Sequence, residues 1–509
     1  MSVIPFIFIG IYFAVIIILT LRTPKAGQHS SFEDFYTGSK SMGAIVVALV
    51  MMVTYYSGST WTGWTGFTAL NGVFAAYCIP YSIFAGIGMY LLASKIWPLG
   101  KEYKLSTLAD LYELRYRSTG LKILTGLLGA IMNVTWITME IVTIGYIIKV
   151  ATNGTVPAAV GSLIAVILLT AYTLWGGVRS VASVNTFQSV VMVFGAIIVV
   201  IALVYLNYGT LAEMFEKAYE VNPMLYVISG EGMQAQWFSF IFLCSAGVLC
   251  YPSLYLKMYL GKNTAEIKKA AILNATGGLW VLAFVFAGFA ITGYTLVTGN
   301  VIDNVEEGLL IILQQTGGPV IFGLGCIFIL AACMGTVDGT LLAISGILSS
   351  DVIEGFKRIA RKAPLTGDET GETGGAESSG KLVRRTRIIV VIIALCAYLI
   401  TLFDLPLLVQ VAMINYQGIA QLFIPLIGAL LWKKATRAGT FTSIIASFAV
   451  TAFLVFAPHG INLHGFLPGI FGIIAGTILF VVVSLATYKE ALPESVYFGK
   501  LTDTMKKYA

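Results

Sequence analysis

Charged residues and histidines are scarce in this 509-residue chain. Only 11% of its residues are charged, three are histidines, and 58% are hydrophobic, with a mean hydropathy of +0.87. A soluble protein of this length carries about twice that share of charge, which excludes a soluble multidomain enzyme. The histidines (29, 459 and 464) lie in predicted loops, and no H-E-x-x-H or G-x-S-x-G motif occurs. A membrane-embedded hydrolase is therefore disfavoured.

Cysteines are also few, and their placement excludes two further classes. The six (78, 244, 250, 326, 333 and 396) all lie in apolar segments without metal-ligand spacing. They are typical of small buried hydrophobes, and a disulfide framework is not expected. The first stretch lacks a basic region and an A-x-A site, so it is interpreted as a retained helix and not as a signal peptide.

Long apolar runs fill the chain from end to end. About 20 apolar residues suffice to cross a bilayer, so the chain is predicted to be an all-α polytopic membrane protein. Thirteen spans are expected, at about 3–21, 43–70, 73–97, 123–149, 156–174, 181–206, 237–256, 270–297, 319–349, 388–403, 406–431, 440–457 and 466–487.

The basic residues orient these spans. Cytoplasmic loops carry an excess of Lys and Arg. If the loops after the odd-numbered spans and the C-terminal tail are cytoplasmic, only Lys149 and Lys217 of the 31 basic residues lie outside. The N-terminus is therefore predicted to be external and the C-terminus cytoplasmic. The basic residues of the predicted cytoplasmic loops account for the net charge of +6, so no nucleic-acid partner is expected.

Two carboxylates lie deep within predicted spans. Asp338 stands in "ACMGTVDGTL" (332–341), and Glu140 in "NVTWITMEIVTIGYIIK". A charged residue at the membrane centre costs about 3 kcal/mol on insertion scales, which marks both as functional candidates. Asp338 either binds sodium, carries a coupling proton, or is neutral and hydrogen-bonded to Asn185 or Thr340. Glu140 either binds solute or belongs to a helix–helix network.

Six short motifs occur in the order seen in the sodium/solute symporter family, which this chain resembles over about residues 31–450. They are "SFEDFYTGSKSMG" (31–43), "TYYSGSTWTGWTG" (54–66), "STLADLYELRY" (106–116), "YTLWGGVRSVASVNTFQ" (172–188), "YPSLYLKMY" (251–259) and "LWKKATRAGTFTS" (431–443). The second and fifth are most similar to the pantothenate and monocarboxylate branch.

The resemblance implies a single transporter domain with a LeuT-type fold. Five helices (43–206) are followed by an inverted repeat (237–431), with one extra helix before them (3–21) and two after (440–487). The first helix of each repeat is expected to be unwound, at "SGSTWTGWTG" and at "CSAGVLCYP". A flexible cytoplasmic loop is expected at 351–387, and a cytoplasmic tail at 488–509.

The resemblance also implies a sodium site between the second and ninth spans. Its ligands would be the carbonyls of Val53, Tyr56 and Ala332, with side-chain oxygens at positions 335 and 336. The family usually has two hydroxyl residues there, whereas this chain has Gly335 and Thr336. The alternative is that both are packing residues of a helix–helix seam.

A second cation or proton site is implied by an exchange of residues between two helices. The family signature has an aspartate where this chain has Asn185. In family members with a second sodium site, that aspartate faces hydroxyls at the positions that match Asp338 and Gly339. The carboxylate has changed helices while the total charge is preserved. Asp338 is therefore a candidate ligand of either cation.

The solute is expected to bind near the second span, which offers hydroxyls and aromatic faces. The candidate residues are Ser57, Ser59, Thr60, Trp61, Trp64, Trp136, Glu140, Tyr255 and Gln417. Motif similarity favours an organic acid, but no Arg or Lys is expected at depth to pair with it, because Lys257 lies near the inner end of a span. Glu140 among aromatic residues would instead suit an amine or a zwitterion.

The predicted function is sodium-coupled symport of a small polar organic solute into the cell by alternating access, in the plasma or inner membrane. Proton coupling through Asp338 is the alternative, and a membrane sensor without net transport is the alternative from another class. A channel is disfavoured by the two unwound helices and the buried carboxylate. Membrane lipid and the solute are the expected partners, and a monomer is expected to suffice.

Overall fold

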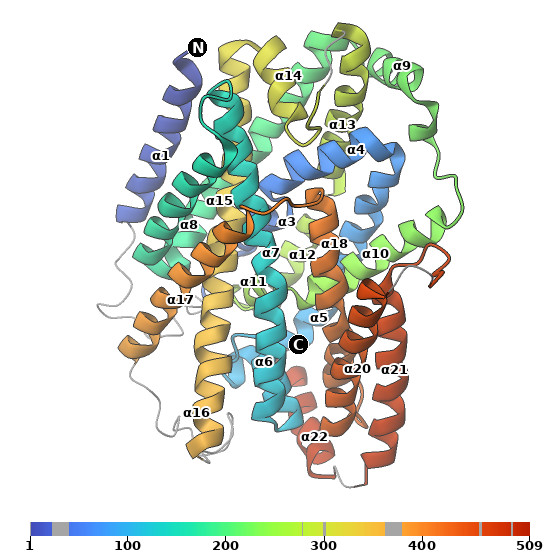
Figure 1. Cartoon of the computed structure of the whole chain (residues 1–509). Coiled ribbons are helices and arrows are strands. Elements are labelled where there is room, and N and C mark those ends of the chain that lie inside the picture. Colours follow the sequence, from blue (N-terminus) through green and yellow to red (C-terminus); the bar gives the residue numbers. More distant parts are fainter. Residues whose placement is uncertain are drawn as a thin grey trace.

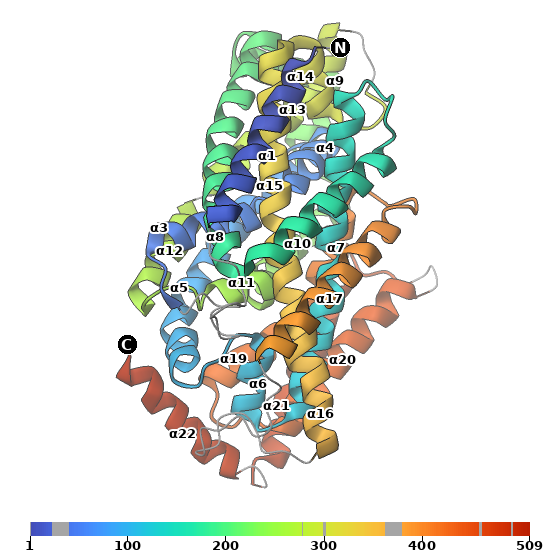
Figure 2. The same cartoon turned by 90° about the vertical axis from the view of Figure 1, so that its left-hand side faces the viewer.

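The protein is a bundle of helices in the part of the chain that the structure describes (Figure 1). The structure is a computed structural model, and it describes residues 2–22, 40–276, 278–298, 302–361, 379–457, 461–489 and 492–508. Figures 1 and 2 place the start of the chain at one end of the bundle and the last helix near the other.

The helices up to residue 226 are α1 (Ile4–Arg22), α3 (Ala44–Tyr55), η2 (Thr60–Trp64), α4 (Thr65–Asn71), η3 (Gly72–Tyr77), α5 (Cys78–Glu102), α6 (Leu108–Tyr116), α7 (Thr119–Ala151), α8 (Ala158–Tyr208), α9 (Leu211–Val221) and η4 (Pro223–Tyr226). They are followed by α10 (Met233–Cys250), α11 (Pro252–Lys257), α12 (Thr264–Thr276), α13 (Gly278–Thr298), α14 (Gly308–Thr316), α15 (Gly318–Ile347), η5 (Leu348–Ile353) and α16 (Glu354–Arg361). The last are α17 (Ser379–Ile400), α18 (Leu408–Ile419), η6 (Ala420–Leu422), α19 (Phe423–Leu431), α20 (Arg437–Phe456), α21 (Pro468–Thr487) and α22 (Leu492–Lys507).

Many of these helices are apolar enough to cross a membrane. Among the described residues, nine helical stretches have the required length and hydropathy, and three apolar helices are shorter (Ala44–Tyr55, Ala158–Ala171 and Val281–Tyr294). The chain is therefore a multi-pass membrane protein. The count of thirteen spans and the layout as two inverted repeats of five stay predictions.

The sequence predicted two separate helices at 156–174 and 181–206, whereas the structure has one continuous helix there. α8 runs from Ala158 to Tyr208 through Gly176 and Gly177. At 1.5 Å per residue it is about 76 Å long, more than twice the hydrocarbon thickness of a bilayer. Figure 2 shows it sharply bent between its two halves. Pairs of glycines are common at such kinks, so the chain turns back without leaving the helix.

The predicted flexible loop at 351–387 is too long. Its first residues belong to η5 and α16, and its last residues, from Ser379 on, to α17. Residues 362–378 lie outside the described residues. The predicted tail at 488–509 contains α22, which packs against α5 and α6.

α15 lies at the centre of the bundle and positions the site. It packs against α1, α3, α7, α8, α11 and α17. Small residues allow this close packing: a Cβ added to Gly335 would lie 2.5 Å from Val53 Cγ2. α3 can therefore approach the α15 backbone more closely than any side chain at 335 would allow.

Candidate cation and solute sites

The first helix expected to unwind does so. α3 ends at Tyr55, the backbone of Tyr56 leaves the helical region with φ −104° and ψ 73°, and helix resumes before the π-helical turn η2. A Cβ on Gly58 would lie 1.9 Å from Cys333 Sγ and 2.9 Å from the Ile329 carbonyl oxygen. Only glycine fits here, because the unwound segment passes directly against α15.

The second expected break lies between α10 and α11. Tyr251 has an extended backbone, with ψ 118°, and Pro252 begins the next helix, where its missing N–H costs nothing. The Tyr251 hydroxyl lies 3.2 Å from Thr340 Oγ1 on α15. Both broken helices are thus joined to α15.

Three of the predicted sodium ligands converge. The Thr336 hydroxyl lies 2.9 Å from the Val53 carbonyl oxygen and 3.1 Å from the Ala332 carbonyl oxygen. The fourth predicted ligand is the carbonyl of Tyr56, which lies one turn after Val53, where the unwound segment begins. Neutral oxygens at the end of a broken helix are a donor set that suits Na⁺.

Gly335 offers the predicted sodium site no side-chain oxygen, because glycine has no side chain. Its carbonyl oxygen accepts a 3.3 Å hydrogen bond from Asn185 Nδ2, and a Cβ there would also lie 3.0 Å from Gln188 Oε1. A hydroxyl side chain would need the neighbouring residues to move. Close packing describes Gly335, while the Thr336 hydroxyl donates hydrogen bonds to the Val53 and Ala332 carbonyl oxygens, which fits both a sodium ligand and a residue of a helix–helix seam.

Asp338 is fully buried, and the structure brings a lysine to it. Lys257, at the end of α11, is 3% exposed, interacts electrostatically with Asp338, and donates a hydrogen bond to Thr54 Oγ1. A Cβ on Gly339 would lie 3.4 Å from Lys257 Nζ. Lys257, which was expected near the inner end of a span, is buried beside Gly339, because α11 follows the break at Tyr251 and packs against α3 and α15.

Glu140 is held by the unwound segment of the α3 region. Its Oε1 accepts a hydrogen bond from Ser59 Oγ at 2.6 Å, and its Oε2 accepts one from Ser59 N at 3.1 Å. Ser57 Oγ lies 2.9 Å from Ser59 Oγ. A carboxylate is favourable at a helix N-terminus, so Glu140 stabilises the restart of the helix.

A small aromatic cavity lies beside the first break. Its lining residues are Tyr55, Tyr56, Thr60, Trp64, Cys78, Tyr81, Ser82, Trp136, Val281, Phe284 and Tyr416, none of them charged. The Trp64 and Trp136 rings are parallel within 5°, with centroids 6.3 Å apart. Within the described residues, four polar atoms of this lining have no hydrogen-bond partner: Tyr55 Oη, Tyr56 Oη, Ser82 Oγ and Trp136 Nε1. The cavity therefore offers aromatic faces and free hydrogen-bonding groups.

Only some of the predicted solute residues line this cavity, namely Thr60, Trp64 and Trp136. Ser57, Ser59 and Glu140 bond to one another, and Trp61 packs edge-on against Phe328. Tyr255 packs against Tyr259, and Gln417 accepts a hydrogen bond from Gly469 N.

The lining residues that the sequence did not predict include Tyr55, Tyr81, Ser82 and Tyr416. Tyr81 and Ser82 lie one helical turn into α5 and more than two turns into the third predicted span, where polar side chains are unusual. That is a signal which sequence reasoning could have used.

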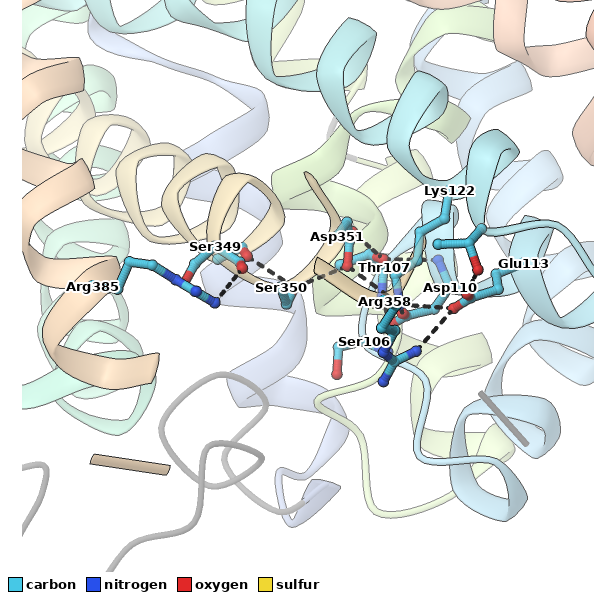
Figure 3. Close-up of polar contacts among 12 residues, drawn as sticks. Ser106, Thr107, Asp110, Glu113, Lys122, Ser349, Ser350, Asp351, Arg358 and Arg385 are labelled. Carbon is cyan, nitrogen blue, oxygen red and sulfur yellow. Dashed lines mark hydrogen bonds and ion pairs between the residues drawn. The ribbon is translucent and has the colours of Figure 1, made fainter. Parts of the chain in front are cut away.

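A second polar cluster lies beyond the C-terminal end of α15 (Figure 3). Lys122, whose side chain is 6% exposed, lies 2.7 Å from Asp110, 3.0 Å from Glu113 and 3.8 Å from Asp351. Thr107 Oγ1 donates to Asp351 at 2.7 Å. The cluster ties α6 and α7 to η5, and we call it the Lys122 cluster.

The pKa of Asp110 in this cluster is lowered. Burial alone would raise it, but attraction and a hydrogen bond from Lys122, with hydrogen bonds from the Ser106 and Thr107 N–H groups, hold the pKa of Asp110 below its ordinary value. The ionised form is therefore favoured in the folded protein.

Two of the motifs that carry the resemblance meet at the same end of the bundle. The buried Arg115 guanidinium donates hydrogen bonds to the carbonyl oxygens of Trp432 at 3.3 Å, Lys433 at 3.3 Å and Ala435 at 3.1 Å. The segment at 106–116 thus fastens the connection between α19 and α20.

Comparison with known proteins places this arrangement in a family. The model of the sodium:solute symporter family matches residues 35–447. An uncharacterized symporter, YodF of Bacillus subtilis, is 22% identical over 97% of this chain and 96% of its own length. A sodium/pantothenate symporter of Haemophilus influenzae is 24% identical, over 90% and 91%. A solved structure of a Na⁺-coupled sialic acid symporter has the same fold, with a TM-score of 0.75, 15% identity and coverage of 95% and 98%. This chain belongs to the sodium:solute symporter family.

Proposed function

We propose that this protein is a sodium-coupled symporter that takes up a small organic acid or amino acid. One observation carries the proposal: a cluster of neutral oxygens and a cavity with free hydrogen-bonding groups lie on either side of the same helix break. The oxygens are at Val53, Ala332 and Thr336, and the cavity begins at Tyr55 and Tyr56. Family members are transporters and not enzymes.

The oxygen cluster provides the coupling. Val53 is on α3 and Thr336 on α15, so a cation bound by both stabilises the arrangement in which these helices are together. That arrangement also shapes the cavity at Tyr56. Binding of the cation therefore favours binding of the solute, and the reverse holds by linkage.

The cavity lining narrows the solute class. Both Glu140 oxygens accept hydrogen bonds from Ser59, and the lining residues are uncharged, so an amine has no ion-pairing partner there. A carboxylate can be balanced by the neighbouring sodium ion and held by the hydroxyls of Tyr55, Tyr56 and Ser82. An apolar body would pack against the faces of Trp64 and Trp136 once the cavity, whose volume is about 20 Å³ in this structure, opens. The sodium/pantothenate relative also transports a carboxylate.

The orientation of the chain is part of the proposal. The end of the bundle with the Lys122 cluster and α22 carries most of the basic residues, so it is assigned to the cytoplasm. The two basic residues predicted to lie outside each pair with an acid, Lys149 with Glu307 and Lys217 with Glu220. With this orientation, symport along the sodium gradient brings the solute into the cell. A monomer is proposed to suffice for this transport.

The test is uptake of labelled organic acids, amino acids, amines and sugars by proteoliposomes, under a sodium gradient or with choline replacing sodium. We expect concentrative, saturable uptake of an acid or amino acid only with sodium. Thr336→Val removes one ligand and should raise the half-saturating sodium concentration about tenfold, equivalent to about 1.4 kcal/mol.

The matched control is Thr442→Val on α20, whose hydroxyl bonds only within its own helix. Its sodium dependence should equal that of the wild type. Concentrative uptake driven by a pH gradient alone would show that the coupling ion is a proton and not sodium. Uptake confined to sugars would refute the assigned solute class.

A further inference from the structure

The N-terminal half of α1 borders a groove between four apolar helices. The groove has a volume of about 350 Å³ and is lined by residues of α1, α7, α8 and α15. Every lining residue except Thr152 is hydrophobic, and the Thr152 hydroxyl donates a 2.8 Å hydrogen bond to the Ile148 carbonyl oxygen of its own helix. The groove therefore offers a ligand apolar contacts and no charged group.

α1 is attached to the bundle along one stripe of its surface, and Figure 2 shows it running beside α15. A Cβ added to Gly323 of α15 would lie 3.2 Å from the Phe8 ring and 3.3 Å from Pro5 Cα. One turn further along, the Tyr12 hydroxyl lies 3.5 Å from Met334 Sδ. The neighbouring stripe of α1 has the same helical spacing and borders the groove instead, through Phe6, Ile9 and Phe13.

The groove opens on the surface of the bundle that faces the membrane. Phe6, Ile164 and Leu168 are exposed at its mouth, whereas Leu330 and Met334 are buried at its floor. Large apolar side chains are also exposed on the same two outer helices, at Ile7 and Ile11 of α1 and at Leu163 and Ile167 of α8. The mouth therefore opens to the hydrocarbon chains of the bilayer and not to water.

The size and chemistry of the groove select its occupant. A cavity of about 150 Å³ lined by aliphatic and aromatic side chains binds benzene, so this groove has room for a longer apolar chain. A single turn of α-helix, about 10 Å wide and about 5.4 Å high, needs more space, so a helix of a second copy does not fit. The sequences at 23–39 and 362–378 are rich in charged and polar residues, so neither suits an apolar groove.

We propose that one acyl chain of a membrane phospholipid occupies this groove as a structural ligand between α1 and the bundle. The chain fills the space beside the second stripe of α1 and contacts Leu330 and Met334 on α15. At 100° per residue, these two positions lie on the opposite side of α15 from Ala332 and Thr336. The lipid therefore packs behind the helix that carries the oxygen cluster.

The site can be mapped on the full-length protein in phosphatidylcholine nanodiscs that contain a phosphatidylcholine with a diazirine in one acyl chain. Illumination attaches this chain to the residues that it touches, and mass spectrometry locates the adducts. Bulk lipid can reach exposed residues such as Ile7 and Ile167, but only a chain inside the groove can reach Leu330 or Met334. We expect adducts at Leu330 or Met334, and adducts confined to exposed residues would overturn the proposal.

A variant that fills the groove tests the same site. Ala165→Phe on α8 places a ring among the lining residues and should abolish the adducts at Leu330 and Met334. The matched control is Ala171→Phe, at an exposed position of the same helix outside the lining, and it should keep the wild-type adducts. Adducts at the buried residues that persist in Ala165→Phe, or that vanish equally in Ala171→Phe, would contradict a chain held in the groove.

Thermal unfolding of delipidated protein in detergent gives a second readout. A ligand that binds only the folded state raises stability, so added phosphatidylcholine should raise the unfolding temperature of the wild type and of Ala171→Phe. It should raise that of Ala165→Phe much less, because the ring replaces the chain, and an equal rise in all three proteins would overturn the proposal. Neither readout involves sodium or solute, so the outcome is independent of the proposed function.

Discussion

Lys40, Lys122 and Lys257 are the buried lysines among the described residues, and the last two are held very differently. Lys122 lies within 4.0 Å of three carboxylates, those of Asp110, Glu113 and Asp351. Lys257 donates a hydrogen bond to the hydroxyl of Thr54 and interacts electrostatically with Asp338. The first lysine is thus held by several ion pairs, to which Arg358 adds one at 3.6 Å from Glu113, whereas the second is held by a hydrogen bond and a longer-range electrostatic interaction.

The difference follows from what each lysine joins. The Lys122 cluster fastens α6 and α7 to η5, and several redundant contacts suit a permanent connection. Lys257 joins α11 to α3, beside the two helix breaks that the proposed transport cycle would move. A single hydrogen bond can form and part, while a network of five charged groups, Arg358 included, resists separation.

The largest expected effect is that of Lys122→Met. It leaves the carboxylates of Asp110, Glu113 and Asp351 together, with Arg358 still 3.6 Å from Glu113, and removing one partner of a buried ion pair costs about 3–5 kcal/mol. We expect the free energy of unfolding to fall by about 5 kcal/mol, at the upper end of this range. This loss would be seen as poor expression or a much lower unfolding temperature in detergent. Lys217→Met, which breaks an exposed pair with Glu220, is the control and should change stability by less than about 1 kcal/mol.

The second prediction concerns how each lysine responds to a compensating change. Lys257→Met should cost about 2 kcal/mol in sodium-free buffer, because it removes a hydrogen bond from a charged group to Thr54. Adding Asp338→Asn should restore part of this loss, because Asp338 and Lys257 interact electrostatically. Adding Asp351→Asn to Lys122→Met should restore little, because Asp110 and Glu113 stay. Double-mutant cycles by thermal unfolding measure both couplings. Equal recovery in the two double variants would erase the contrast between the sites.

The sequence predicted the fold more fully than the site. The two breaks were expected from small residues and a proline at "SGSTWTGWTG" and "CSAGVLCYP", because local composition decides where a helix unwinds. The convergence of Val53, Ala332 and Thr336 followed from family positions. Lys257 could not be predicted, since its depth depends on the direction that α11 takes after Tyr251. That direction is set by packing against α3 and α15, which no local pattern records.

The third prediction is a smaller effect at Glu140. In Glu140→Gln the amide oxygen can still accept from Ser59, but the second oxygen becomes a donor that faces Ser59 N. A hydrogen bond to a charged group contributes about 2 kcal/mol to stability, so the free energy of unfolding of Glu140→Gln should be lower by about that amount. Solute affinity, measured by binding at saturating sodium, should fall by less than about tenfold. A complete loss of binding in a stable Glu140→Gln protein would instead place Glu140 in contact with the solute.

The smallest expected effect is the pH dependence contributed by Asp110. Its pKa is lower in the folded protein than in the unfolded chain, chiefly because Lys122 outweighs the opposing effect of burial. The stability it contributes is therefore full above the unfolded value of about 3.9 and is lost as the pH falls through the folded value. Unfolding temperatures between pH 3 and 6 should show the wild type approaching Asp110→Asn at the acid end. A constant difference would contradict this assignment.

The contact between Gly58 and Cys333 makes the protein its own chemical reporter. Cys333 is buried against the unwound segment, whereas Cys396 is exposed on α17. Cys396 lies within the apolar span predicted at 388–403, where lipid would shield it from a water-soluble maleimide, and the reagent can reach Cys333 only when the unwound segment moves away from α15. The rate at which Cys333 reacts, with and without sodium, therefore times the opening of the bundle without any introduced label.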